Sequence, residues 1–235
     1  MLKTNLHFHT AEDDAHDIAY DLYTGIDHAR EKGFDVLAVT CHRKYVCTSE
    51  HVAYAAERDM LLIPGIEADI YEGSNRNHVL ILNATSDVEE VRTFDDLTQY
   101  RARHEEVLVI APHPYHVGGF SLHGLLEQYI HLFDAVEQSW FYSRFFDRNK
   151  KARLVAEQHA KPYIATSDTH FLDFMDDSYA VLRAEKNTRS VIEAVRSGAF
   201  TNVTSPRSFV RDMLWRTGTF MAADALRSRQ KRKGR

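Results

Sequence analysis

Cysteine, proline and glycine are scarce in this 235-residue sequence, which contains two, five and ten of them. The two cysteines, Cys41 and Cys47, match neither the spacing of a zinc ribbon nor a redox CxxC pair, and no signal-peptide pattern precedes them. We therefore expect free thiols in the reducing cytoplasm, with Cys41 a small buried hydrophobe. No glycine-rich phosphate loop follows the first apolar run, which argues against an open dinucleotide-binding sheet.

Long apolar runs and a strong charge bias are also missing. No apolar run approaches the roughly 18 residues that cross a bilayer, so we expect a soluble protein with no membrane partner. The net charge of −5 is spread in mixed signs, so it does not indicate nucleic acid or a membrane as an obligatory partner. The exception is the basic run RSRQKRKGR at 227–235, which is typical of a solvated tail and has nucleic-acid contact as its alternative reading.

Short apolar runs rich in β-branched residues alternate with stretches of helical period, as in a chain of βα units. This rhythm favours one α/β barrel of seven or eight parallel strands over residues 1–207, followed by a helix and basic tail at 208–235. We expect strands at 2–9, 35–40, 61–67, 78–82, 107–111, 133–137 and 162–166. We expect helices at 17–32, 50–58, 88–105, 122–131, 144–159 and 189–197, with Gly33 ending the first.

Histidines and carboxylates gather where the predicted strands end. The first strand ends on His7 and His9, whose side chains share a face because strand side chains alternate. The carboxyl ends of parallel barrel strands meet at one face, so we expect these residues to cluster with those ending four later strands. Those residues are His42, Glu67, His113, Asp168 and His170. Imidazole and carboxylate without thiolate suit Zn²⁺, Mn²⁺ or Fe²⁺, whereas His78 begins its predicted strand and departs from the pattern.

The ordered motifs resemble those of the PHP (polymerase and histidinol phosphatase) family of metal-dependent phosphoesterases. They are NLHFHTAEDDA at 5–15, TCH at 40–42, GIE at 65–67, APHP at 111–114 and SDTH at 167–170, against family patterns DLHxHSxxSDG, TDH, GxE, HP and SDAH. The resemblance covers roughly residues 3–205 and implies a distorted seven-stranded α/β barrel. Asn5 and Cys41 stand where the family has aspartate, and Ala15 replaces a glycine. We expect Asn5 and Cys41 to change the hydrogen bonds behind the ligands and hence the metal preference.

The resemblance implies two to three divalent ions, Zn, Mn or Fe, in one pocket. One ion would be held by His7, His9, Glu67 and Asp168. Glu67 would bridge to a second ion held by His78 and His113. A third would be held by His42 and His170 with one ligand from the loop after the first strand. That ligand is Asp14, which aligns with the SDG aspartate, or alternatively His16.

Such a site implies phosphoester hydrolysis by a hydroxide that bridges the ions, with Glu67 and Asp168 as catalytic residues. His116 is a candidate proton donor to the leaving group, and Glu137 a candidate support for a ligand. Candidate phosphate contacts are Arg43, Lys44 and Arg144.

The sequence is compatible with several classes of substrate. Only 34 residues separate His78 from His113, which leaves no room for an inserted lid domain. We expect a small phosphomonoester as substrate, with the end of a nucleic-acid strand as the alternative. A metal-binding domain without turnover, and hydrolysis of a carbon–nitrogen bond, are the remaining alternatives.

Overall fold

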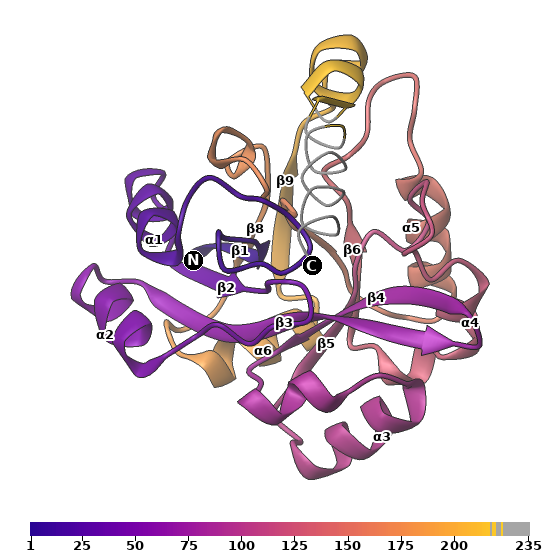
Figure 1. Ribbon diagram of the computed structural model, residues 1–235, viewed down its shortest axis with the longest axis horizontal. Helices are drawn as coiled ribbons and strands as arrows, with labels where there is room; N and C mark the ends of the chain where they lie inside the picture. The colour runs from indigo at the N-terminus through magenta and orange to yellow at the C-terminus, as the bar shows by residue number, and fades with distance from the viewer. Residues whose placement is uncertain (217, 220–221, 223–235) are drawn as a thin grey trace, which may run out of the picture.

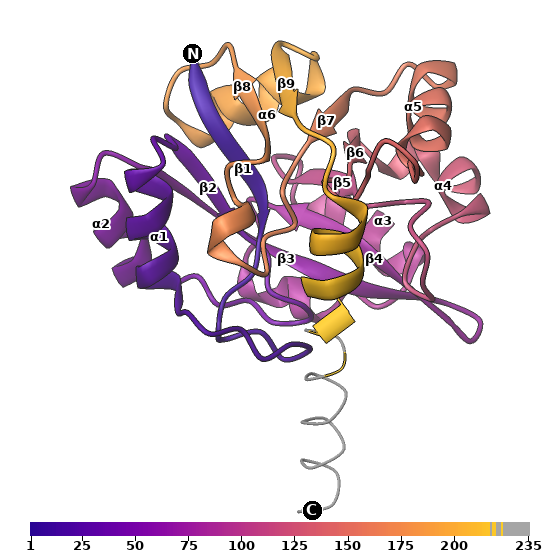
Figure 2. The same ribbon diagram turned by 90° about the horizontal axis from the view of Figure 1, so that it is seen from above.

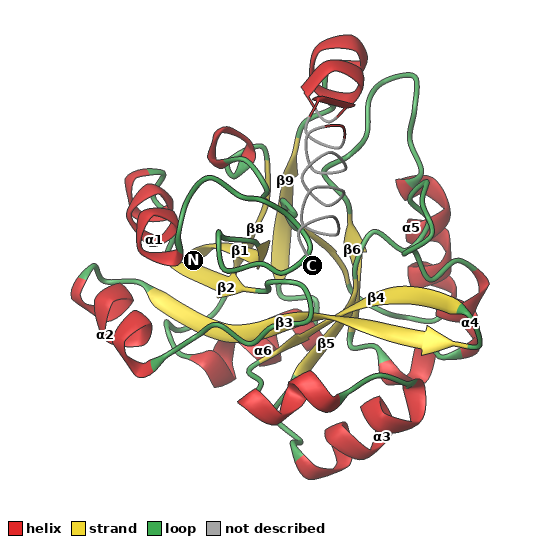
Figure 3. Ribbon diagram, viewed as in Figure 1, coloured by secondary structure: helices red, strands yellow, loops and turns green. Residues whose placement is uncertain are grey.

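Nine strands form one sheet that curls into a nearly closed barrel, with the α-helices arranged around it (Figures 1 and 3). The structure is a computed structural model and describes residues 1–216, 218–219 and 222. The strand order is β7-β6-β5-β4-β3-β2-β1-β8-β9. The strands are β1 (Leu2–Phe8), β2 (Val36–Val39), β3 (Leu61–Glu72), β4 (Asn75–Leu82), β5 (Leu108–Ala111), β6 (Ala135–Gln138), β7 (Tyr163–Ala165), β8 (Ser178–Leu182) and β9 (Phe200–Thr204).

Several of the α-helices begin where the sequence supplies a capping side chain. Asp21 caps α1, Thr93 caps α3 and Asn187 caps α6 by accepting from backbone N–H groups of the first turn. Gly33, with φ of 75°, follows α1 as expected. The α-helices are α1 (Leu22–Glu31), α2 (Ser49–Glu57), α3 (Phe94–Arg103), α4 (Gly124–Gln128), α5 (Asn149–Gln158) and α6 (Thr188–Arg196). Short 3₁₀ turns are η1 (Ser86–Glu90), η2 (Ile130–Leu132) and η3 (Leu172–Phe174), and a π-helix, η4, spans Phe209–Arg216.

All seven predicted strands are present, but the seven-strand count and the mainly parallel sheet are not confirmed. β8 and β9 add two strands, and β4, β8 and β9 pair antiparallel with their neighbours. The predicted helix at 88–105 is split into η1 and α3, because the Thr93–Asp96 capping box starts a new helix. The predicted helix from 208 is represented by η4, whereas the basic run at 227–235 lies outside the described residues.

The two ends of the barrel differ in what fills them. Buried side chains of α6, among them Val191, Ile192 and Val195, join the apolar cluster made by the barrel strands. Lys186, just before α6, contacts Asp35 and Asp59, which precede β2 and β3. α6 therefore closes the end where the parallel strands begin, which is the end at which the N-terminus lies (Figure 2). The opposite end, where these strands finish, is left for polar groups.

The gap in the sheet between β7 and β9 is bridged by a side chain. Asn202 of β9 accepts from the backbone N–H of Ala165 (2.9 Å) and donates to the carbonyl of Tyr163 (2.8 Å), both in β7. Nearer the other end, a single bridge joins Phe8 to Thr169, with His9 N–H donating to the Thr169 carbonyl (3.1 Å). These contacts hold the segment after β7 against β1.

Candidate metal centre

Seven histidine and carboxylate side chains expected at strand ends converge at the end of the barrel opposite α6. They come from the ends of β1, β2, β5 and β7, as expected, and from within β3, which runs on past Glu67. Donor atoms of three groups lie within 4.8 Å of one another: His9, His42 and His170; His7, His9, Glu67 and Asp168; and His42, Glu67 and His78. His113 joins them through Glu67, with its Nε2 3.1 Å from Oε1. With His78 from β4, six segments of the chain therefore supply one polar cluster.

Glu67 lies at the middle of the cluster and is fully buried. Its Oε2 faces Nε2 of His7, His9 and His42 at 3.1, 3.3 and 3.0 Å. Its Oε1 faces Nδ1 of His78 at 2.8 Å and Nε2 of His113 at 3.1 Å. Each carboxylate oxygen thus has its own group of imidazoles, so Glu67 could offer one oxygen to each of two ions.

The donor atoms around Glu67 have the spacing of ligands. Atoms bound 2.0 to 2.1 Å from a tetrahedral ion lie about 3.3 Å apart. Asp168 Oδ1 is 3.4 Å from His7 Nε2 and 3.3 Å from His9 Nε2. Within the described part of the chain, His9 Nε2 and Asp168 Oδ1 are buried and have no hydrogen-bond partner. Buried polar atoms seldom remain unsatisfied, so these residues fit a divalent cation.

Backbone strain accompanies two of these residues. His113 has φ of 27° and Asp168 has φ of 43°, in the left-handed region that non-glycine residues rarely adopt. Such conformations cost of order 1 to 3 kcal/mol each and persist where the surroundings impose them. His113 faces Glu67 and Asp168 faces His7 and His9, so both strained residues have their side chains in the cluster, which supports a functional interpretation.

The loop after β1 arranges its three polar residues differently from the expectation. The Asp14 side chain is 60% exposed and faces Lys44, with 3.9 Å between the carboxylate and the ammonium group. The ring of His16 instead lies against His42 and His170, with centroid distances of 5.0 and 4.9 Å. The structure therefore brings the alternative, His16, to the cluster and leaves Asp14 outside it.

Asp13, which sequence reasoning missed, is the buried carboxylate of this loop. Its Oδ2 accepts from Nδ1 of His9 and Nδ1 of His42, both at 2.9 Å, and from the backbone N–H of His42 at 2.8 Å. Its Oδ1 accepts from the backbone of Ala15 and His16. A hydrogen bond at Nδ1 leaves Nε2 of each imidazole free to face Glu67. The adjacent aspartates gave no signal of which one points inward.

His78 reaches the site because β3 and β4 form a long antiparallel hairpin. β3 continues five residues past Glu67, and His78 pairs with Asp69 inside the hairpin. The expectation that β3 ends at Glu67 and that the next strand begins at His78 is therefore wrong. Asp69 is a second missed residue, 1% exposed, with Oδ1 3.4 Å from His78 Nε2. The two-residue spacing from Glu67 was the signal that it shares that face.

Residues behind the cluster hold its imidazoles. Glu137 is fully buried and its Oε2 accepts from Nδ1 of His7 at 2.9 Å, as expected of a supporting residue. Asn5 accepts from the backbone N–H of His7 (3.2 Å) and donates to the hydroxyl of Thr169 (3.1 Å). Cys41 is buried beside Thr10, and both cysteines are free, as predicted. Asn5 therefore links β1 to the segment that carries Asp168.

The charges of the cluster are strongly coupled. Burial lowers the pKa of His7, but the carboxylates of Asp168, Glu67 and Glu137 raise it, for a net rise to about 10. Burial raises the pKa of Glu67, but the surrounding imidazoles, led by His78, hold it well below its usual value. The carboxylates are therefore ionised, and their negative charge is compensated by the imidazoles. Divalent ions with neutral imidazole ligands would compensate the same negative charge.

The other predicted residues differ in their exposure and in their partners. The Arg43 side chain is one-third exposed, with Nε 3.7 Å from Asp69 Oδ2. Lys44 faces Asp14, and Arg144 is exposed in the loop between β6 and α5. His116 lies 6.1 Å from His113, ring to ring. Burial and the charge of His113 lower the pKa of His116 to about 4, which argues against a proton donor at neutral pH.

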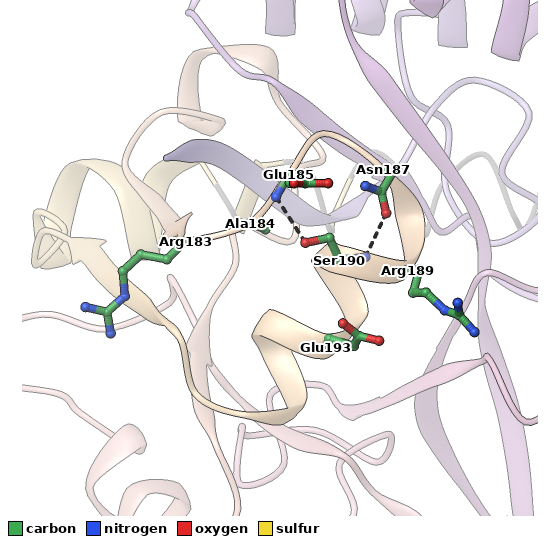
Figure 4. A pocket seen from close by; sticks show the side chains of 7 residues that line it. All are labelled: Arg183, Ala184, Glu185, Asn187, Arg189, Ser190 and Glu193. Carbon is green, nitrogen blue, oxygen red and sulfur yellow. Dashed lines mark hydrogen bonds between the residues drawn. The ribbon is translucent and has the colours of Figure 1, made fainter.

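A separate surface pocket lies at the start of α6, near the other end of the barrel (Figure 4). Its polar groups pair with one another, since Ser190 Oγ accepts from the Glu185 backbone N–H and Asn187 Oδ1 accepts from the Ser190 backbone N–H. These are helix-capping contacts, so they need no ligand.

No protein-family model and no curated protein matches this sequence. Solved structures with the same fold include a protein with a predicted phosphoesterase, an amidohydrolase and an endonuclease. One is a two-domain protein from Bacteroides vulgatus containing a predicted PHP-like metal-dependent phosphoesterase (TM-score 0.63, 17% identity), matched over 86% of this chain and 64% of its own. An amidohydrolase from Chromobacterium violaceum, with bound sulfate and no metal, matches over 89% and 95% (0.52, 17%). A lesion-specific endonuclease from Pyrococcus furiosus matches over 86% and 57% (0.60, 11%).

At these identities the likeness concerns the fold. This chain spans less than two-thirds of the Bacteroides and Pyrococcus chains, so their other parts have no counterpart in the match. The fold is one that PHP-like metal-dependent phosphoesterases use, in agreement with the motifs. In the described part of the chain, every helix is too short or too polar to cross a bilayer.

Proposed function

We propose that this chain is a metal-dependent hydrolase of phosphoesters and that its preferred substrates are phosphomonoesters. The observation that carries the proposal is the divided environment of Glu67, with one carboxylate oxygen facing His7, His9 and His42 and the other facing His78 and His113. Divalent ions held there would supply a nucleophile at neutral pH and neutralise charge on the phosphoryl oxygens.

The proposed ligand sets follow the convergence of donors. His7, His9, Glu67 and Asp168 would hold one ion, and Glu67 with His78 and His113 a second. His42 and His170 would hold a third, with His16 in place of Asp14. This chemistry of imidazole and carboxylate suits Zn²⁺, Mn²⁺ or Fe²⁺.

The remaining residues would position these ligands. Asp13 and Glu137 accept from Nδ1 of His9, His42 and His7, which presents the three Nε2 atoms to the centre in one tautomer. Because both carboxylates are buried, the imidazoles cannot rotate without losing a charge-assisted hydrogen bond. The chain therefore provides a preorganised site, and we assign no proton donation to His116.

A second candidate is hydrolysis of a phosphodiester at the end of a nucleic-acid strand. The Pyrococcus endonuclease, which has the same fold, favours keeping it. The two functions would use the same metal centre and would differ in the part of the substrate that lies beside it, a small leaving group or a nucleic-acid strand. Hydrolysis of p-nitrophenyl phosphate, bis(p-nitrophenyl) phosphate, an oligonucleotide and an anilide should be compared to separate monoesterase, diesterase, nuclease and amidase activities.

The test replaces Glu67 by Gln, which keeps the volume and removes the bridging charge. We expect hydrolysis of the preferred phosphoester to fall at least about 100-fold and bound metal, measured by elemental analysis, to fall with it. Glu72→Gln, on the same strand but bonded to Tyr129, is the matched control and should keep both. Full activity and metal content in Glu67→Gln would contradict the proposal.

A further inference from the structure

Asp69 is surrounded by more positive charge than it can neutralise. Its Oδ2 is 3.4 Å from NH1 of Arg76 and 3.7 Å from Nε of Arg43, while its Oδ1 faces His78. Both guanidinium groups are always charged, so one buried carboxylate faces two fixed cations. The two guanidinium groups therefore share one carboxylate at this point of the barrel end.

The Arg76 side chain is held from two sides. Asp69 contacts one edge of the guanidinium group, and the ring of Phe120 lies under it, 4.2 Å from Cζ. Phe120 in turn stacks on His78, with centroids 5.0 Å apart and planes 7° apart. The backbone N–H of His78 donates to the Phe120 carbonyl (2.8 Å), which ties this loop to the hairpin. Arg76 is thus fixed before any ligand arrives, which lowers the entropic cost of binding.

The two arginines lie next to the metal centre. The backbone N–H of Arg43 donates to the carbonyl of Glu67 (3.0 Å), and Arg43 has φ of 58°, which turns the chain at this point. His78 alone separates Asp69 from Glu67, since its two nitrogens face one carboxylate each. Both arginine side chains are one-third exposed, so their remaining donors are accessible from solvent.

We propose that Arg76 and Arg43, both held by Asp69, form a binding site for the anionic oxygens of the substrate beside the metal centre. Because both contact the same carboxylate oxygen, they are close enough for one phosphate-sized anion to accept from both. This site deepens the proposed function and rests on it, and it makes Asp69 a positioning residue. Phosphate, with several anionic oxygens, is the ligand class that two guanidinium groups recognise best.

A purely structural role for these ion pairs predicts a different result for the loss of Arg76. If Arg76 only neutralises Asp69 within the β3–β4 hairpin, its loss lowers stability and leaves anion affinity unchanged. Arg58 offers a matched comparison on the far side of the fold. It pairs with Asp27 and stacks on Tyr54 (3.3 Å from Cζ to the ring centre), and its exposure is similar at 30%.

The experiment titrates the full chain with inorganic phosphate by calorimetry, with and without bound Mn²⁺. We expect Arg76→Gln to weaken phosphate binding about tenfold at unchanged manganese content, and Arg58→Gln to leave it unchanged. Arg76→Lys should give an intermediate loss, because it keeps the charge without the planar fork, and it serves if the glutamine variant does not fold.

Equal phosphate affinity in Arg76→Gln and Arg58→Gln would overturn the anion site. Loss of manganese together with phosphate binding would also overturn it, because Arg76 would then act on the metal centre. Phosphate binding that depends on Arg76 in a chain that hydrolyses no phosphoester would instead contradict only the proposed function.

Discussion

Asp13 and Asp14 are neighbours in sequence with opposite surroundings. The Asp13 carboxylate is buried and accepts from the imidazoles of His9 and His42, whereas the Asp14 carboxylate faces solvent beside Lys44. Alignment with the PHP motif placed the functional carboxylate at Asp14. A turn in which the Asp13 N–H donates to the Thr10 carbonyl, together with the hydrogen bonds of Ala15 and His16, turns the other one inward.

This contrast predicts the effects of two matched substitutions. Asp13→Asn should weaken metal binding about 10- to 100-fold, because Asp13 accepts hydrogen bonds on both oxygens whereas an uncharged amide has one acceptor oxygen, so the ligands lose their orientation. Asp14→Asn should leave metal binding unchanged. Competition with a chromophoric chelator measures both affinities. The reverse order, with Asp14→Asn the weaker binder, would restore Asp14 as the ligand.

Among the strands, the closure of the barrel depends on a side chain where backbone pairing is absent. β7 has three residues and β9 has five, and the side chain of Asn202 in β9 makes hydrogen bonds to the backbone of Ala165 and Tyr163 in β7. Because β7 leads directly to Asp168 and His170, this closure also positions part of the metal centre. The β3–β4 hairpin makes the second such contribution, since its length brings His78 and Asp69 to the site.

Replacing Asn202 by Ala should destabilise the fold by about 2 kcal/mol, because the N–H of Ala165 and the carbonyl of Tyr163 lose their partner. Chemical unfolding monitored by circular dichroism measures the change. Thr201→Ala, with an exposed side chain on the same strand, is the control and should have a smaller effect. Equal stability of the two variants would show that Asn202 does not close the barrel.

The molecule as a whole has one end closed by apolar packing and one end filled by charge. α6 covers the first end with Val191, Ile192 and Val195, and the second concentrates ionised carboxylates and imidazoles that are almost entirely buried. Burying charges is costly unless each is compensated. Bound cations should therefore contribute to the stability of the whole fold as well as to chemistry.

Metal addition should raise the melting temperature. At a hundredfold excess of free metal over the dissociation constant, linkage adds about 2.7 kcal/mol, which corresponds to a rise of roughly 5 to 10 °C for a chain of this size. Differential scanning calorimetry with Mn²⁺ or Zn²⁺, and again after a chelator, measures it. Glu67→Gln should show a smaller rise. An unchanged melting temperature with no metal in the purified protein would remove the basis for the metal centre.

The sequence by itself was enough to place seven strands and to predict that His7, His9, His42, Glu67, His113, Asp168 and His170 meet at one end. This succeeded because residues at the ends of parallel barrel strands converge by geometry, and because alternation along a strand puts His7 and His9 on the same face. The strands β8 and β9 were missed because their residues alternate in burial over only five positions, whereas the shorter strands β2 and β5 were found because each is a continuous apolar run.

Only the tertiary structure decided which groups support that centre. The inward turn of Asp13, the position of His78 within an antiparallel hairpin, and the pairing of Asp69 with Arg43 and Arg76 all depend on contacts between segments far apart in sequence. Local periodicity reports which face of a strand a residue occupies, but it carries no information about which strand lies beside it. The tertiary packing therefore determines which side chains pair with one another, and with them the groups that surround the candidate metal centre.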